Sequence, residues 1–163
     1  MILAIDPGTT QSAWVVYHNG KVLDKGIDDN DELLCQFGYG FTKDMQDLEK
    51  DVVYIEMVAS YGMAVGQTVF ETCVWIGRFQ QEAYNNGYEV EMIYRKDVKM
   101  YLCGQTKAKD SNIRQAIMDR YGSERSVVIG TKKAPGPLYG VSKDIWAALG
   151  VAITAEAQNV EPR

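Results

Sequence analysis

The stretch Met1-Ile-Leu-Ala-Ile-Asp6-Pro-Gly-Thr-Thr10 decides the fold, because a short apolar run ends there in an acid and a Pro-Gly turn. An apolar run bounded by turn signals predicts a buried strand. We therefore expect Asp6 at the carboxyl end of that strand, where α/β sheets place their chemistry. The alternative is an acid that only stabilises its own turn.

Composition excludes several classes of protein. The chain has 163 residues, of which 46% are hydrophobic, and a mean hydropathy of −0.24. These values predict a single globular domain spanning residues 1–163. No apolar run approaches the roughly 20 residues of a membrane span, so we expect no membrane association. Three scattered cysteines without a C-x-x-C pair argue against disulfides and zinc and favour a cytoplasmic location.

Charge is divided unevenly along the chain. Residues 1–91 carry 5 lysines and arginines against 15 acidic residues, whereas residues 92–163 carry 12 against 7. Tyrosines such as Tyr94, Tyr101 and Tyr121 are interleaved with the basic residues of the second part. This asymmetry indicates a nucleic-acid-binding face. A solvated, salt-bridged helical surface is the alternative. With a single histidine in the chain, carboxylates are the expected catalytic groups.

The pattern of strands begins with a meander. Residues 11–18 and 21–27 flank an Asn19-Gly20 turn, which is a strong hairpin signal. Asp51-Val-Val-Tyr-Ile-Glu56 repeats the opening pattern of an apolar strand that ends in an acid, and residues 88–93 predict a fifth strand. We expect helices over residues 29–50 (interrupted near Gly38), 63–85, 95–102, 111–121 and about 141–157.

The expected helix over residues 63–85 carries more apolar surface than one packed face needs. Its apolar stripe follows helical spacing, but Phe70, Val74 and Trp75 lie off that stripe. Deep burial and a self-association face both explain this surplus.

Two acids stand near the starts of later helices. Asp110 begins the helix over residues 111–121, where it is expected to cap the helix or to contribute to a metal site. Asp144 precedes Ile145 near the start of the last helix, at the border of an apolar face with i, i+3, i+4 spacing.

This order of strands, helices and acids resembles the ribonuclease H-like fold of the bacterial Holliday junction resolvases of the RuvC family. The motifs that carry the resemblance are Ile5 to Thr9, Ile55-Glu56, Ile76-Gly77-Arg78, Tyr94 to Lys109, and Asp144 with residues 148–154. The resemblance implies an α/β fold with a central mixed five-stranded sheet, three antiparallel strands followed by parallel additions, flanked by helices. Phage-encoded members look most similar in the last helix. The expected location is therefore the bacterial cytoplasm, or the cytoplasm of the host if the protein is encoded by a phage.

The resemblance also implies a function, namely nicking of branched DNA such as Holliday junctions by two-metal-ion phosphodiester hydrolysis. Asp6 would bridge two Mg²⁺ ions, Glu56 would hold one and orient water, and Asp144 would complete the other site. Mn²⁺ is expected to substitute for Mg²⁺, and no organic cofactor is expected. The implied DNA-binding residues are Lys96, Lys99, Lys107, Lys109 and Arg114. The surplus apolar surface of the helix over residues 63–85, together with the symmetry of a four-way junction, predicts a homodimer through Phe70, Val74 and Trp75.

The chain departs from the family pattern at one position, and two alternative functions remain open. The family's last helix usually carries a second metal-coordinating residue three positions after the first, where this chain has Ala147. The residues Asp6 to Thr10 also resemble the phosphate loop of actin-like ATPases and sugar kinases, although no second such motif is present. A non-catalytic junction-binding module would keep the basic segment without needing three acids.

Overall fold

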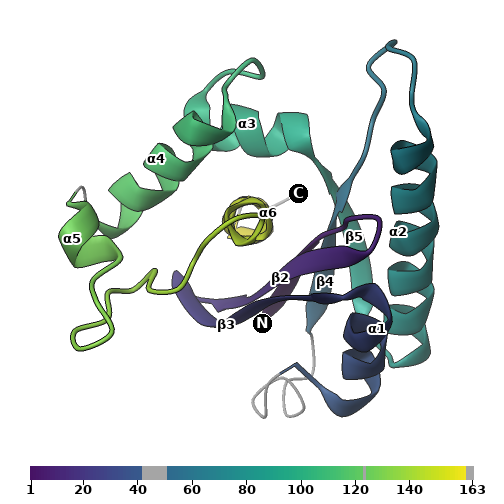
Figure 1. Ribbon diagram of the computed structural model, residues 1–163, viewed down its shortest axis with the longest axis horizontal. Coiled ribbons are helices and arrows are strands. Elements are labelled where there is room, and N and C mark those ends of the chain that lie inside the picture. The colour runs from purple at the N-terminus through teal and green to yellow at the C-terminus, as the bar shows by residue number, and fades with distance from the viewer. Residues whose placement is uncertain (42–50, 123, 161–163) are drawn as a thin grey trace.

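A mixed five-stranded sheet forms the centre of the protein, as the computed structural model shows for residues 1–41, 51–122 and 124–160 (Figure 1). The strands are β1 (Ile2–Asp6), β2 (Gln11–His18), β3 (Lys21–Asp29), β4 (Val52–Met57) and β5 (Glu89–Tyr94). Their order across the sheet is β3-β2-β1-β4-β5. The first three strands pair antiparallel, and β4 and β5 are added in parallel. The predicted α/β architecture is confirmed.

The opening strand β1 occupies the middle of the sheet. It pairs antiparallel with β2, where Ile5 lies opposite Trp14, and parallel with β4, where Ile5 lies opposite Ile55. Leu3, Ala4 and Ile5 have no exposed surface. A strand buried on both faces is the expected outcome of a continuous apolar run.

One face of the sheet is covered by two layers of helices. Helix α6 (Ile145–Val160) packs directly on the sheet, and α3 (Arg95–Cys103), α4 (Asp110–Tyr121) and the single turn α5 (Arg125–Val128) lie around it. Figure 1 shows α6 end-on between the sheet and the arc of α3, α4 and α5. Because α6 is enclosed from both sides, Ala148, Leu149 and Val151 have no exposed surface.

The opposite face is covered by one layer, formed by α1 (Asn30–Tyr39) and α2 (Gln67–Asn85). Phe37 of α1 and Phe79 of α2 are buried there, with ring centroids 6.5 Å apart. A second apolar core therefore lies beneath α1 and α2. No helix among the described residues combines the length and the apolar character that crossing a membrane requires.

Several helix boundaries differ from the sequence-based expectations. Helix α2 begins at Gln67 rather than at Met63, after Gly66 in an extended conformation. Helix α6 begins at Ile145 rather than near Val141, because Lys143 adopts a left-handed conformation with φ of 47° that interrupts helical geometry. Helix α1 ends at Tyr39, close to the expected interruption, and residues 42–50 of that expected helix lie outside the described residues.

Candidate active site

Asp6 lies at the carboxyl end of β1, as the opening motif predicts. It is opposite Ala13 in the register with β2, so the turn between the two strands begins directly after it. Within this turn a side chain at Gly8 is impossible without rearrangement, since its Cβ would lie 2.2 Å from the carbonyl oxygen of Gln11. The glycine thus allows the tight path that sets Asp6 at the edge of the sheet.

Two buried polar residues hold this turn in place, and the motif analysis missed both. The Gly8 amide donates to Ser12 Oγ at 3.1 Å, and Asn30 Nδ2 donates to the Gly8 carbonyl at 3.0 Å. Ser12 Oγ in turn donates to Asn30 Oδ1 at 2.6 Å. Buried polar groups of this kind are normally hydrogen-bonded. A serine and an asparagine flanking the strands are only a weak signal in the sequence, and their role in holding the turn becomes evident from the fold.

Glu56 lies beside Asp6 on the neighbouring strand. Because β1 and β4 run parallel with Ile5 opposite Ile55, the acid that follows each isoleucine reaches the same edge of the sheet. Burial raises the pKa of Asp6 from 3.8 to about 8, and the nearby Glu56 carboxylate adds to the rise. Burial also raises the pKa of Glu56. Two carboxyl groups that resist joint ionisation form a site that favours a bound cation.

Arg95 links the candidate site to α4, a role that sequence reasoning did not assign. As the first residue of α3 it follows β5 directly, and its guanidinium lies 3.1 Å from Glu56 Oε2 and 2.7 Å from Asp110 Oδ1. Arg95 opposes the upward pKa shifts of Asp6 and Glu56, and its hydrogen bond lowers the pKa of Asp110. The only signal in the sequence was an arginine directly after an apolar strand.

Asp110 differs from the expected helix cap. The N-cap of α4 is Lys109, and Asp110 is the first residue within the helix. Its side chain is directed to Arg95 at 2.7 Å, because the guanidinium offers a stronger charged partner than the amides of its own helix. An acid in the first turn still complements the positive end of the helix.

Asp144 lies immediately before α6, where its carbonyl oxygen accepts hydrogen bonds from the amides of Ala147 at 2.9 Å and Ala148 at 3.2 Å. Its exposed side chain lines a cleft of about 200 Å³ together with Arg95 and Asp110. We call this the Asp144 cleft, and its other lining residues are Ile113, Arg114, Lys143, Trp146 and Ala147. Asp144 raises the pKa of Asp6, so these two acids lie within electrostatic range of each other.

The three predicted acids gather at one place without forming a ready ligand set. Among residues 1–41, 51–122 and 124–160, no three acidic, histidine or cysteine side chains lie close enough together to hold a metal ion. Carboxylate oxygens nevertheless suit hard cations such as Mg²⁺. The pKa of Asp6 is raised mainly by burial and further by the neighbouring carboxylates of Glu56 and Asp144, and a bound cation would oppose this rise. In donor chemistry and charge, the residues fit a divalent cation that would compete with Arg95 for Glu56.

The predicted DNA-binding residues lie at different distances from these acids. Lys99 lowers the pKa values of Glu56 and Asp110, and Arg114 lines the Asp144 cleft. Lys96 lies 5.6 Å from the ring of Tyr94 and is exposed. Lys107 and Lys109, between α3 and α4, are also exposed. Lys99 and Arg114 are therefore the members of this set that the fold brings near the site.

The predicted dimer residues differ in how exposed their side chains are. Phe70 and Val74 on α2 each leave 62% of their surface exposed. Trp75 is half-buried, with its ring 5.8 Å from the ring of Phe79 and the Arg78 guanidinium 4.0 Å from its centroid. The exposed apolar surface on α2 thus belongs to Phe70 and Val74, and Trp75 belongs largely to the core beneath them.

Comparison with known proteins yields structural similarity only. No family model matches the sequence, and no curated protein sequence matches it. The fold defines a ribonuclease H-like α/β protein, with the mixed five-stranded sheet described above. Within that class the chain is similar to RuvC from Thermus thermophilus, with a TM-score of 0.62, 17% sequence identity and coverage of 99% of each chain.

A second similar structure is Thermus thermophilus RuvC in complex with a Holliday junction substrate. It has the same TM-score of 0.62 and identity of 17%, and the match covers 97% of this chain and 93% of that chain. The chain therefore has a RuvC-like fold over almost its whole length, as the sequence motifs predicted.

Proposed function

We propose that this chain is a structure-selective endonuclease that nicks branched DNA, including Holliday junctions, within a single nuclease domain over residues 1–163. The observation that carries the proposal is the pair of the half-buried Asp6 and the buried Glu56, side by side at the ends of parallel strands with Asp144 in electrostatic range. The RuvC-like fold supports it, since one similar structure was solved with a junction substrate.

Asp6, Glu56 and Asp144 are the residues that would hold Mg²⁺, with Mn²⁺ as a substitute and no organic cofactor. A divalent metal pair supplies a nucleophilic water and stabilises charge on the attacking and leaving oxygens of a phosphodiester. Glu56 would hold the metal in place of its contact with Arg95, whose guanidinium lies 3.1 Å from Glu56 Oε2. Asp144 is exposed at the cleft and is free to turn inward.

Arg95 is the residue that makes this exchange possible at low cost. It keeps a second partner, Asp110, at 2.7 Å when Glu56 is released. The Arg95 side chain is partly accessible, with 28% of its surface exposed. A guanidinium released from one carboxylate beside a cleft is well placed to bind a phosphate through paired hydrogen bonds.

Phosphate contacts beyond the site would come from α3, α4 and the segment between them. Lys96, Lys107 and Lys109 are exposed there, and Lys99 and Arg114 lie nearer the acids. Contacts of this kind give affinity that is largely independent of base sequence and falls steeply with salt.

A homodimer through α2 would complete the enzyme. Resolution of a four-way junction requires two matching nicks, and a two-fold dimer presents two identical sites. Phe70 and Val74 provide the exposed apolar surface for such an interface, with Trp75 supporting them from beneath.

A nicking assay tests the proposal. Labelled four-way junctions and linear duplexes of the same sequence are incubated with the protein, with Mg²⁺ and with EDTA. We expect Mg²⁺-dependent nicks in the junction and intact linear duplex. Tight junction binding without nicks in either Mg²⁺ or Mn²⁺ would instead identify a non-catalytic binding module. Nucleotide hydrolysis without nicks would favour the actin-like alternative.

A further inference from the structure

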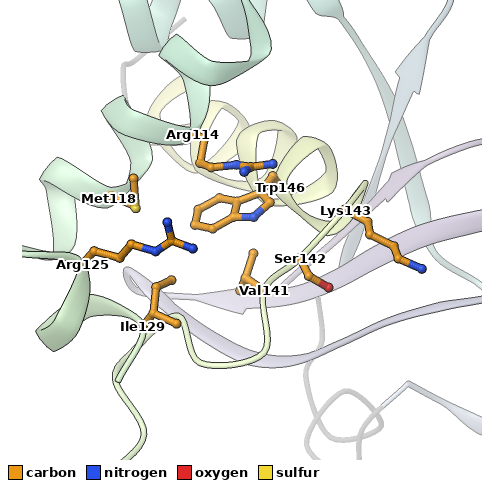
Figure 2. A pocket seen from close by; sticks show the side chains of 8 residues that line it. All are labelled: Arg114, Met118, Arg125, Ile129, Val141, Ser142, Lys143 and Trp146. Atoms are coloured by element: carbon orange, nitrogen blue, oxygen red, sulfur yellow. The ribbon is translucent and has the colours of Figure 1, made fainter. Parts of the chain in front are cut away.

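A second cavity of about 180 Å³ adjoins the Asp144 cleft and has no role in the site described so far. We call it the Trp146 pocket. Arg114 and Met118 reach it from α4, Arg125 from α5, and Val141 from the segment before α6 (Figure 2). Its volume corresponds to on the order of ten water molecules, which is larger than one phosphate group alone would fill.

The pocket carries positive charge from two arginines, of which Arg114 also lies within electrostatic range of Asp110. Figure 2 shows the guanidinium groups of Arg114 and Arg125 directed to the indole of Trp146, with the Arg114 group 5.4 Å from the ring centroid. Within residues 1–41, 51–122 and 124–160, no acidic side chain forms an ion pair with either arginine. Two guanidinium groups that converge without a carboxylate partner favour an anionic occupant.

The floor of the pocket is apolar and aromatic. Trp146 and Val141 are buried, and Met118 and Ile129 are half-buried beside them. A site for a bare phosphate does not need this surface. A planar base attached to a phosphate uses both parts, because bases pack on aromatic, apolar and guanidinium surfaces while the phosphate pairs with arginine.

The pocket adjoins the candidate active site. It shares Arg114, Lys143 and Trp146 with the Asp144 cleft, and Figure 2 shows the Lys143 side chain directed away from the indole. A DNA strand whose phosphate lies at the acids therefore has an adjoining cavity for a neighbouring nucleotide. This step rests on the proposed function, because it takes the strand in the cleft to be the cleaved strand.

We propose that the Trp146 pocket binds one unstacked nucleotide of the cleaved strand, next to the scissile phosphate. Arg114 and Arg125 hold its phosphate, and its base lies on the floor formed by Trp146 and Val141. Extraction of a base from the stack costs least where pairing is already interrupted. The pocket thereby selects strands at branch points over continuous duplex.

An abasic scan tests the proposal. The cut made by the wild type on a four-way junction is mapped, and the nucleotides around it are replaced one at a time by an abasic residue that keeps the phosphates. We expect one position, next to the cut, at which cleavage slows about tenfold, which is the size expected for one stacked base. Affinity without divalent metal is expected to fall at the same position.

Arg125→Ala is the matching protein variant. It should lower the affinity for the intact junction and largely remove the penalty of the abasic residue, because a nucleotide whose phosphate is no longer held does not place its base in the pocket, so the two losses are not additive. Arg120→Ala is the control, because Arg120 is also exposed but lies 4.8 Å from the ring of Tyr101, outside the pocket. The abasic penalty should persist in this variant.

The outcomes separate the pocket from the proposed function. If the wild type cuts junctions but tolerates every abasic position within about twofold, the pocket does not bind a base and the inference is overturned. Weak binding by Arg125→Ala together with such tolerance would show a phosphate site only, which also overturns it. If the wild type cuts no branched DNA, the proposed function fails. The affinities of the abasic junctions, measured without divalent metal, then test the pocket by themselves. A loss at one position supports the pocket, and uniform affinity overturns it.

Discussion

The two faces of the sheet are covered by different numbers of helical layers. On one face α6 is sealed between the sheet and the α3, α4 and α5 arc, so that Leu149 and Ala152 have no exposed surface. The acids and the arginines meet at the edge of this double layer. On the other face α1 and α2 form a single layer, and Phe70 and Val74 remain 62% exposed.

This difference indicates a division of labour. The double layer encloses its inner helix α6, and its outer helices α3 and α4 carry charged groups such as Arg95, Lys99 and Arg114. A single layer leaves apolar surface that a second protein surface can cover. We therefore propose that nucleic acid binds on the α3 and α4 side and that α2 forms the protein contact, and the following predictions test this proposal.

The largest effect is expected from neutralising the acids. Asp6→Asn, Glu56→Gln and Asp144→Asn should each lower Mg²⁺-dependent nicking by about a thousandfold, because each removes one oxygen ligand of the proposed metals. Junction binding in gel-shift experiments should be retained. Asp119→Asn, which removes an exposed acid from α4, is the control and should nick normally. Nicking near the wild-type rate by any of the three variants removes that residue from the site.

The next effect concerns the single-layered face. Val74→Glu and Phe70→Glu should give folded monomers, since a buried charge without a partner is costly at an interface. Sedimentation at micromolar concentration measures this. Val127→Glu is a matched control, because Val127 on α5 is 61% exposed and lies on the other side of the molecule. A wild type that sediments as a monomer, free and on a junction, would contradict the α2 dimer.

A smaller effect concerns the stability of the metal-free protein. The pKa of Asp6 is raised from 3.8 to about 8 on folding. The folded state therefore binds more protons than the unfolded state, and stability falls as pH rises from 3.8 to about 8. Asp6→Asn removes this loss. In EDTA its Tm should exceed that of the wild type at pH 8, and the gap should shrink at pH 5.

Adding Mg²⁺ to the same Tm measurement tests whether Asp6 is a metal ligand. It should raise the Tm of the wild type at pH 8, because a ligand that binds only the folded state stabilises it, and it should change Asp6→Asn much less. An equal response of the two proteins to Mg²⁺ would place the metal elsewhere.

The smallest effect is expected at Ala147, which lines the Asp144 cleft three residues after Asp144. An added carboxylate there supplies another oxygen ligand, so Ala147→Asp should reach half-maximal nicking at a lower Mg²⁺ concentration. For the wild type, Mn²⁺ should support nicking at lower concentration than Mg²⁺. Ala147→Asn, of similar size but neutral, is the control. Identical metal dependence in all three proteins would show that the position does not face the metal.

Much of the fold was readable from local patterns. The apolar runs before Asp6 and Glu56 predicted two buried strands, and Asn19-Gly20 predicted the hairpin between β2 and β3. These patterns are local because side-chain alternation and turn conformation depend on neighbours in the chain. The parallel pairing of β1 and β4 then explains why two acids more than forty residues apart in sequence reach one edge.

Helix boundaries and partners were less predictable. The start of α6 depends on the left-handed conformation of Lys143, which few non-glycine residues adopt and which no motif announced. The packing of the half-buried Trp75 ring against Phe79 was likewise not evident from the sequence, and its predicted role as an interface anchor stays a prediction. Both outcomes follow from contacts with residues that are adjacent only in the folded chain.

By itself, the sequence determined the order of strands, the acids at their ends and the basic character of the second part of the chain. Only the tertiary structure decided which basic side chain forms an ion pair with which acidic one. Twelve basic residues follow position 91, yet Arg95 alone among those described forms ion pairs with Glu56 and Asp110, over separations of 39 and 15 residues. The physical reason is that β5 ends beside β4 and that α4 packs against α3 and α6, a geometry set by long-range packing.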